Sequence, residues 1–299
     1  MSEVKRIPGA EAVTVKGWWM AYRWLILRRF SQLGIIGLFL IGPLAGVWIV
    51  QGNINSSLTL DVVPLTDPYV LLQSLVARHA PEVTAVYGAL IIITFYVLVG
   101  GRAYCAWVCP VNIVTDAAHW LRARLDLKGG SRLSATMRYW LLGASLIASA
   151  ITGTIIWELV NPVSMMYRGL IFGMGTAWVI ILAVFLFDLL ISQRGWCSHL
   201  CPVGAFYSVL GKASIVRVSA IDRERCNDCT DCLKVCVEPQ VLKLPLYGAE
   251  KGAGPIVLSP NCTNCGRCID VCTEDVFKFV TRFGETHKPI SHIAEETQS

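Results

Sequence analysis

Twelve cysteines are the residues of this chain whose spacing points most directly to a chemical task. Eight of them form two runs of the pattern C-x2-C-x2-C-x3-C, at residues 226–236 and 262–272. Bacterial ferredoxins hold two [4Fe-4S] clusters with this spacing, and the fourth cysteine of each run ligates the other cluster. We therefore predict one cluster with the ligands Cys226, Cys229, Cys232 and Cys272, and a second with the ligands Cys262, Cys265, Cys268 and Cys236.

Disulfide bonds and zinc sites are the alternative uses of such cysteines. Disulfides are disfavoured because the two runs follow a basic flank that we expect to face the reducing cytoplasm. Zinc sites more often use two C-x2-C pairs than three closely spaced cysteines followed by a fourth. The iron–sulfur interpretation is therefore the stronger one.

The remaining four cysteines form two copies of the pattern C-x3-C-P. Segments 102–111 and 194–203 align without gaps, and each follows a long apolar run. Proline is tolerated in a first helical turn, so Cys109 and Cys201 are expected to cap a new helix after each pair. Three interpretations of Cys105, Cys109, Cys197 and Cys201 stay open: a metal or third cluster on four thiolates, a redox-active or transient metal-binding dithiol pair, or buried structural thiols.

Two carboxylates near the ends of apolar runs are candidates for accepting protons from a quinol. Asp188 lies toward the inner end of the fourth run, and Glu158 lies at the outer end of the third. Ionisable residues at such positions are often functional. The alternative for each is an interfacial carboxylate or a hydrogen bond between packed helices.

Four apolar runs, at about 33–50, 83–100, 139–157 and 170–191, are long enough to cross a bilayer of roughly 30 Å as helices. The chain is 54% hydrophobic and 16% charged, which does not fit an ordinary soluble protein. We predict a mainly α, polytopic membrane protein: four transmembrane helices, arranged as two repeated hairpins, followed by a cytoplasmic ferredoxin-like module with two [4Fe-4S] clusters.

Lysine and arginine alternate between rich and poor segments along the chain. Residues 1–30, 101–138 and 193 onward are rich in them, whereas 51–82 and 158–169 hold one each. By the positive-inside rule, both termini, the 101–138 loop and the clusters should be cytoplasmic, and the chain should lie in a bacterial inner membrane. The net charge of +5 then reflects basic flanks facing membrane lipid, and no nucleic-acid partner is expected.

These boundaries predict four regions. Residues 1–30 form a cytoplasmic, interfacial N-terminal segment, in which a separate helix and a simple extension of the first span are equal alternatives. Residues 31–212 form the membrane domain, 213–284 the ferredoxin-like module, and 285–299 a disordered tail. In the outer loops, Thr66 or Asp67 should begin a short helix ahead of Pro68, and Asn161-Pro162 should form a turn.

Several further motifs accompany the cysteines: KGWW at 16–19, VPLTDP at 63–68, NPVSMM at 161–166, LFDLL at 186–190 and TEDVF at 273–277. With them, the chain resembles the NapH family of membrane quinol dehydrogenase components of periplasmic nitrate reductase systems. The resemblance implies electron transfer from quinol toward nitrate reduction. It implies as partners a periplasmic iron–sulfur subunit and a membrane-anchored multihaem cytochrome.

The leading hypothesis is therefore an electron-transfer subunit of a quinol dehydrogenase, not a complete enzyme by itself. Because the clusters are expected inside and nitrate reduction outside, either an electron crosses the bundle or a cytoplasmic iron–sulfur protein is a further partner. The alternatives are a copper- or metal-handling accessory reductase that uses the C-x3-C-P thiols, and a membrane anchor or assembly platform.

Overall fold

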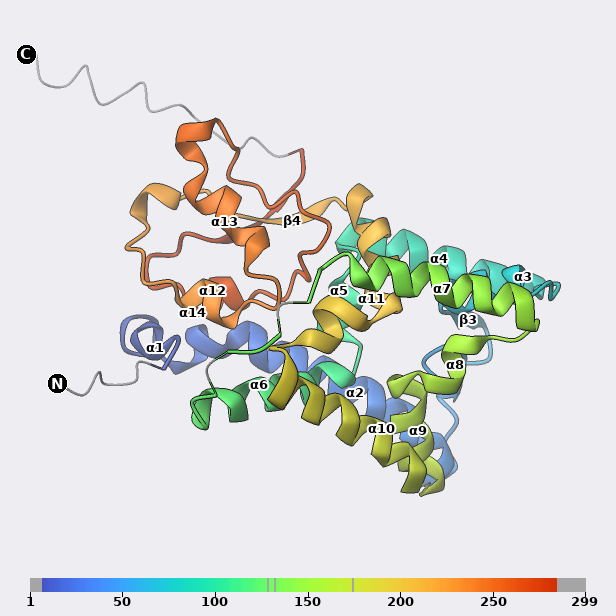
Figure 1. Ribbon diagram of the computed structural model, residues 1–299. Coiled ribbons are helices and arrows are strands. Elements are labelled where there is room, and N and C mark those ends of the chain that lie inside the picture. Colours follow the sequence, from blue (N-terminus) through green and yellow to red (C-terminus); the bar gives the residue numbers. More distant parts are fainter. Residues whose placement is uncertain (1–6, 128, 132, 174, 284–299) are drawn as a thin grey trace, which may run out of the picture.

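The computed structural model describes residues 7–127, 129–131, 133–173 and 175–283. The predicted tail at 285–299 lies outside these residues. The fold is mainly helical and has two parts, a helical bundle and a small C-terminal module that sits at one end of it. Figure 1 shows the module, in orange and red, beside α1 and the first turns of α2.

Helix α2, Trp18–Ala45, is the longest described element and contains most of the first predicted span. It starts directly after Gly17, so the aromatic and basic segment at 18–30 is an extension of the span and not a separate helix. Gly46, with a left-handed φ of 73°, ends α2 before the predicted boundary at residue 50. Helix α1, Ala10–Lys16, precedes it.

The other three predicted spans are also helical, but two of them are interrupted. Helix α4 covers Val83–Val99 as predicted. Helix α7, Met137–Thr152, ends at Gly153, and the fourth run is divided at Gly173 into α9, Pro162–Phe172, and α10, Gly175–Leu186. Both glycines adopt left-handed φ values, which end helices because side chains disfavour them.

Among the described residues, α2 alone combines the length and hydropathy needed to cross a bilayer. Helix α4 and residues 177–191, which continue α10 into the π-helical segment η1, Phe187–Ile191, are apolar but shorter. The predicted number of four transmembrane helices therefore stays a prediction.

The first outer loop folds into a sheet that the sequence analysis did not predict. Strands β1, Val50–Gly52, β2, Ser56–Thr59, and β3, Val63–Thr66, pair antiparallel in that order. Helix α3, Pro68–Val76, follows, and the Asp67 carboxylate accepts a hydrogen bond from the backbone N–H of Tyr69, which confirms the predicted helix start. Strand β3 packs along α4 at Gly88, where a Cβ atom would lie 2.9 Å from the Thr66 nitrogen.

The second outer link is also folded. Helix α8, Ile156–Val160, leads to Asn161, whose side chain caps α9 by accepting a hydrogen bond from the Val163 N–H. Asn161 and Pro162 thus begin an eleven-residue helix in place of the short turn expected there. Helices α9 and α10 pack against each other, so this link turns back toward the bundle.

Each cysteine–proline motif lies in a short helical segment and is followed by a new helix. The first motif occupies α5, Ala103–Trp107, and precedes α6, Val111–Arg124. The second occupies the π-helical segment η2, Trp196–Leu200, and precedes α11, Pro202–Leu210. The two helices confirm the prediction, and Cys201 is the N-cap of α11 as expected. The expected cap at Cys109 is wrong, because Pro110 is the N-cap of α6.

The C-terminal module consists of short elements around a small core. These are η3, Gly211–Ala213, β4, Val216–Ser219, η4, Arg223–Arg225, α12, Asp231–Val235, α13, Gln240–Tyr247, η5, Ala249–Lys251, α14, Arg267–Val271, and β5, Lys278–Thr281. Strands β4 and β5 pair antiparallel. The module contacts the N-terminal part of α2. There, Asp270 accepts hydrogen bonds from the N–H groups of Trp24 and Leu25, each at 3.1 Å.

Candidate functional site

The structure gathers the eight cysteines of the module around two cavities. One cavity, of about 320 Å³, is lined by Cys226, Cys229, Cys232 and Cys272. The other, of about 350 Å³, is lined by Cys236, Cys262, Cys265 and Cys268. The fourth cysteine of each run thus lies in the cavity of the other run, which is the exchange that the spacing predicts.

Local backbone geometry explains how three cysteines of one run can face one cavity. Asp228 and Thr230 in the first run, and Asn264 and Gly266 in the second, have φ values between 47° and 73°. These left-handed residues turn the chain tightly between successive cysteines. Each run then enters a five-residue helix, and its fourth cysteine follows directly at the C-terminal end.

The donor set fits a cubane better than a single metal ion. Burial, together with the neighbouring thiols of Cys272, Cys229 and Cys226, raises the pKa of Cys232 to about 12. Among the described residues, no three His, Cys, Asp or Glu side chains lie close enough to hold one ion. A [4Fe-4S] cluster does not require this, because each of its four thiolates bonds to a different iron.

A third cavity, of about 500 Å³, lies inside the helical bundle and is the largest of the three. All four cysteines of the C-x3-C-P motifs line it: Cys105, Cys109, Cys197 and Cys201. Both outer segments contribute to its walls, Asp67 from the first and Trp157 and Asn161 from the second. The indole N–H of Trp157 has no hydrogen-bond partner among the described residues.

Each proline motif places a helix start beside a cysteine. Cys201 is the N-cap of α11, with Pro202 at the first helical position and no hydrogen bond from the helix to the Cys201 side chain. In the first copy, Pro110 is itself the N-cap of α6, and Cys109 lies one residue before it. Free N–H groups at a helix start favour an anionic sulfur, although burial raises the pKa of Cys201 to about 12.

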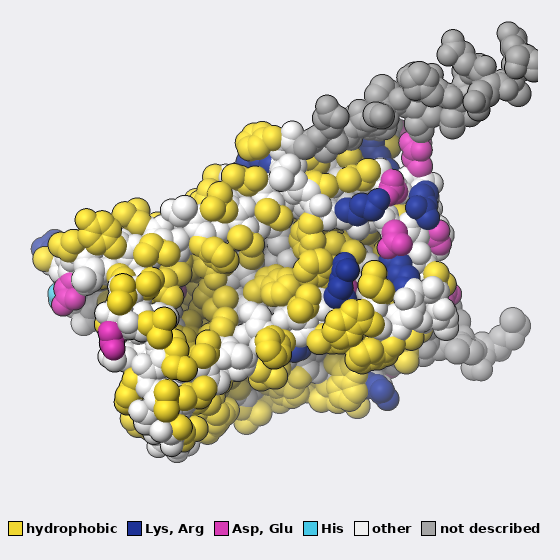
Figure 2. Space-filling view, turned by 180° about the vertical axis from the view of Figure 1, so that it is seen from behind, with side chains coloured by type: hydrophobic (Ala, Val, Ile, Leu, Met, Phe, Trp, Pro, Cys, Tyr) yellow, Lys and Arg dark blue, Asp and Glu magenta, His cyan; other side chains and the backbone are white. Residues whose placement is uncertain are grey.

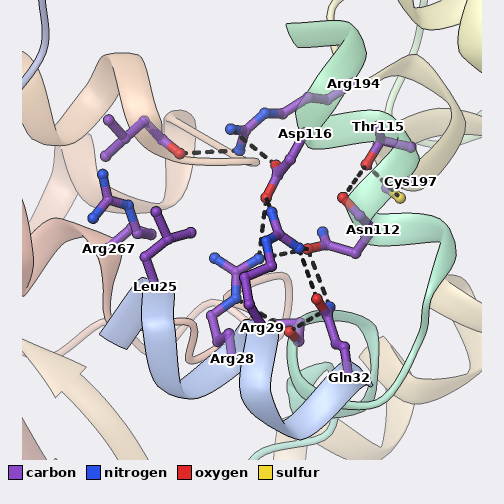
Figure 3. Close-up of polar contacts among 12 residues, drawn as sticks. Leu25, Arg28, Arg29, Gln32, Asn112, Thr115, Asp116, Arg194, Cys197 and Arg267 are labelled. Carbon is purple, nitrogen blue, oxygen red and sulfur yellow. Dashed lines mark hydrogen bonds and ion pairs between the residues drawn. The ribbon is translucent and has the colours of Figure 1, made fainter. Parts of the chain in front are cut away.

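Arginines surround the backbone of both motifs. Arg28 donates to Ala106 O of the first motif at 3.1 Å, and Arg138 donates to Ser198 O of the second at 3.0 Å. Figure 3 shows Asp116 between Arg194 on one side and Arg28 and Arg29 on the other. Burial would raise the pKa of Asp116, but these three arginines outweigh it and lower the pKa below its usual value.

A second ion-pair group joins the bundle to the module. Arg102 and Arg138 each donate to the same oxygen of Glu238, at 2.7 and 2.6 Å. All three side chains are at most 1% exposed. Burial alone would lower the pKa of Arg102, but Glu238 and the nearby thiols raise it above its usual value, so the guanidinium stays charged.

The buried charges near the two motifs do not balance. Among the described residues, five buried arginines, Arg28, Arg102, Arg122, Arg138 and Arg194, and the partly exposed Arg29 lie near three carboxylates, Asp116, Asp188 and Glu238. If every one of these groups is charged, an excess of three positive charges remains. An uncompensated buried charge is costly, so this part of the bundle favours an anionic occupant.

The two predicted proton acceptors, Asp188 and Glu158, lie outside the lining of the third cavity. Asp188 is fully buried and accepts a hydrogen bond from the Trp196 N–H at 2.9 Å, so it ties η1 to η2. Glu158 is half-buried and accepts hydrogen bonds from the side chains of Asn55 and Asn161. Neither carboxylate lines the third cavity.

Several residues of these sites were not predicted. Asp67, Trp157 and Glu238 line cavities, and Arg102 bridges two of them. The one available signal was that an arginine precedes the first cysteine by three positions in both motif copies, as Arg102 and Arg194. Nothing in the sequence showed that the outer segments fold back toward the thiols.

Comparison with known proteins assigns both halves of the bundle to one family. A family model described as "4Fe-4S binding domain" matches residues 83–128 and again 174–219. Each match contains one C-x3-C-P motif, whereas all eight cysteines of the module lie beyond both matches. The repeated match supports the internal repeat inferred from the sequence.

Three curated relatives align over nearly their whole lengths. The Ferredoxin-type protein NapH of Escherichia coli is 50% identical over 96% of this chain and 100% of its own. The Ferredoxin-type protein NapH of Haemophilus influenzae is 48% identical over 95% and 98%. The Methylamine utilization ferredoxin-type protein MauN of Paracoccus denitrificans is 53% identical over 91% and 95%.

No solved structure matches significantly. The curated relatives favour iron–sulfur electron transport over the metal-handling alternative. On this sequence similarity and the arrangement of its cysteines, the chain belongs to the NapH family of ferredoxin-type iron–sulfur electron-transport proteins.

Proposed function

We propose that the chain is a membrane electron-transfer subunit that takes electrons from quinol and passes them toward a periplasmic nitrate reductase. The observation that carries the proposal is the pair of four-cysteine cavities in the module. A [4Fe-4S] cluster accepts and donates one electron at a time, so two such sites suit a two-electron donor. The cysteines lining each cavity are the proposed ligands.

The proposed role in nitrate reduction rests on the relatives named NapH, and other relatives suggest a second role. MauN relatives, which are named for methylamine utilization, are 52% and 53% identical to this chain. Both assignments share the electron-transfer chemistry and differ in the final acceptor. The proposed partners are a periplasmic iron–sulfur subunit and a membrane-anchored multihaem cytochrome, with a cytoplasmic iron–sulfur protein as the alternative.

The proposed location is the inner membrane, with α2, α4, α7 and α10–η1 as four spans. Large apolar side chains are exposed on all of them, among them Leu33, Phe95, Trp140 and Leu182. In Figure 2, hydrophobic side chains cover most of the bundle, and charged ones gather at the end that carries the module. The distribution of lysine and arginine supports a cytoplasmic module.

The third cavity is the proposed site of a third [4Fe-4S] cluster. It is larger than both cavities of the module and also presents four thiols. A cubane on four thiolates carries a charge of about −2, which matches the sign of the buried arginine excess. Transient metal binding and buried structural thiols are the alternatives; four thiolates around one divalent ion would carry the same charge of about −2, whereas protonated structural thiols would carry none.

Iron content tests these assignments. Anaerobically purified protein should contain about twelve irons per chain, and about eight would leave the third cavity without a cluster. Replacing Cys105, Cys109, Cys197 and Cys201 by serine should remove about four irons, and so should replacing Cys226, Cys229, Cys232 and Cys272 as the matched control. Failure of any quinol to reduce the clusters of the intact protein would overturn the quinol proposal.

A further inference from the structure

Arg102 hydrogen-bonds to residues that line the third cavity and to residues that line the nearer cavity of the module. Its Nη1 donates to Glu238 Oε1 at 2.7 Å and to the backbone oxygen of Asn261 at 3.0 Å. Its Nη2 donates to the backbone oxygen of Cys197 at 2.9 Å. One guanidinium thus spans the boundary between the bundle and the module.

On the module side, both partners belong to the 350 Å³ cavity. Glu238 and Asn261 line it directly. Glu238 follows Cys236 by two positions, and Asn261 immediately precedes Cys262. Arg102 is therefore held by residues adjacent in sequence to two of the four proposed ligands.

On the bundle side, Arg102 is equally close to the four thiols. It is the N-cap residue of α5, which carries Cys105, and the charge of its guanidinium acts to lower the pKa of the Cys105 thiol against the effect of burial. A Cβ atom on Gly204, a residue that lines the third cavity, would lie 3.8 Å from Arg102 Nη2. The same cation is thus in contact with the surroundings of both cavities.

Arg138 makes a second connection of the same kind. From α7, its Nη1 donates to Glu238 Oε1 at 2.6 Å and to the Ser198 oxygen at 3.0 Å. The three side chains carry a net charge of +1 if all are ionised. Because they are buried, water screens this charge poorly, and its effect on neighbouring groups is larger than at a surface.

We infer that Arg102, together with Glu238 and Arg138, couples the third cavity to the nearer module cavity, so that the charge held in one site is felt in the other. This rests on the proposed function, because it requires a redox group in both cavities. Arg102 favours the more negative, reduced form in both sites. Glu238 opposes reduction, mainly in the cavity that it lines.

Reduction potentials followed by EPR test this inference. In Arg102→Gln, two of the three cluster potentials should shift negative together, while the potential of the Cys226, Cys229, Cys232 and Cys272 site should not move. In Glu238→Gln, the nearer module site should shift positive. A tenfold change in the reduction equilibrium, which is about 59 mV for a one-electron couple, is the expected minimum.

Control variants distinguish the effect of the Arg102 charge from a general disturbance of the structure. Arg102→Lys keeps the positive charge but loses the planar guanidinium with its paired N–H donors. The cluster potentials in this variant should therefore lie closer to wild type than those in Arg102→Gln. The side chains of Arg223 and Asp222 neither line a cavity nor hydrogen-bond to a residue that lines one, so Arg223→Gln and Asp222→Asn should leave all potentials unchanged.

Two results would overturn the inference. One is an Arg102→Gln variant that keeps its full iron content but in which only one cluster potential, or none, differs from wild type. If that variant loses iron, an unchanged potential in Glu238→Gln decides against the inference instead. About eight irons in the wild-type protein would show that the third cluster is missing; the coupling would then fail, whereas the two module clusters and the proposed electron-transfer function would stand.

Discussion

Each cysteine–proline pair is followed directly by a helix. In the second copy Pro202 occupies the first helical position, where its missing N–H costs nothing, and in the first copy Pro110 is the N-cap. At this scale, spacing predicted which of the eight module cysteines would lie together. It did not predict the roles of Arg102 or Glu238, because an arginine repeated in both motif copies does not show which distant residue it contacts.

His119 provides a pH-dependent prediction. Burial, and then the positive charge of Arg194, lower the pKa of His119 to about 4, whereas an unfolded histidine titrates near 6.5. The unfolded chain therefore binds the proton more tightly, and stability falls as the pH drops from about 6.5 toward 4. His119→Gln should remove about 2 kcal/mol of the stability lost between about pH 7 and pH 5, measured by unfolding in detergent.

The charged groups next to His119 must be considered when the pH dependence of stability is interpreted. Asp116, Arg122 and Arg194 face it, as does the backbone at Lys234. The pKa of Asp116 is lowered, so this carboxylate titrates below the tested window. An unchanged pH profile in His119→Gln would mean that the imidazole is not held in its neutral form by the fold.

Glu158 is the carboxylate to test for proton acceptance. It is half-buried near the outer ends of the helices, whereas Asp188 is fully buried and already bonded to the Trp196 N–H. We expect Glu158→Gln to lower quinol oxidation by about 100-fold, the size of a general-base contribution. Glu82→Gln, another carboxylate at the outer end of a helix, should have no effect. Equal activity in both variants would exclude this role for Glu158.

Short helices and folded links, more than long spans, hold the thiols in place. The length of the apolar runs located the helices correctly but did not show where each helix ends. Gly153 and Gly173 end helices inside predicted spans because they adopt left-handed backbone angles. The three-stranded sheet at 50–66 was missed because its residues show no clean alternation of buried and exposed positions. The cap at Asp67 could be predicted because a polar residue followed by proline is a local signal.

Gly101 controls how closely the first motif approaches α11. A Cβ atom at this position would overlap the backbone of Tyr207 and Gly211, and neither can move without shifting the helix. Gly101→Ala should therefore lower the free energy of unfolding by about 3 kcal/mol and reduce iron in the third cavity. Gly143→Ala on α7 is the matched control, because it would meet nothing within 4 Å and should be neutral or slightly stabilising. Equal stability of both variants would contradict the close contact.

At the scale of the whole molecule, charge asymmetry and the position of the module make one prediction about topology. The N-terminal helix and the module are held together, because the Gly9 N–H donates to Asp231 at 2.9 Å. Both must therefore lie on the same side of the membrane. The sequence alone indicated that side through lysine and arginine. It could not show the contact, which joins residues far apart in the chain.

Reporter fusions check this arrangement. Alkaline phosphatase, which is active only outside the cytoplasm, should be inactive when joined after residue 283 or residue 127. It should be active when joined after residue 80. High activity after residue 283 would reverse the orientation and place the module outside.

The walls of the third cavity also have a consequence for how the protein matures. They come from segments between Asp67 and Gly204, and each half of the chain supplies one pair of thiols. During synthesis the chain emerges from its N-terminus, so this cavity cannot exist until the second half has been inserted and folded back. The cysteines of the module all lie further along and depend less on the bundle. Whatever group occupies the bundle must therefore be acquired late, after membrane insertion and not before it.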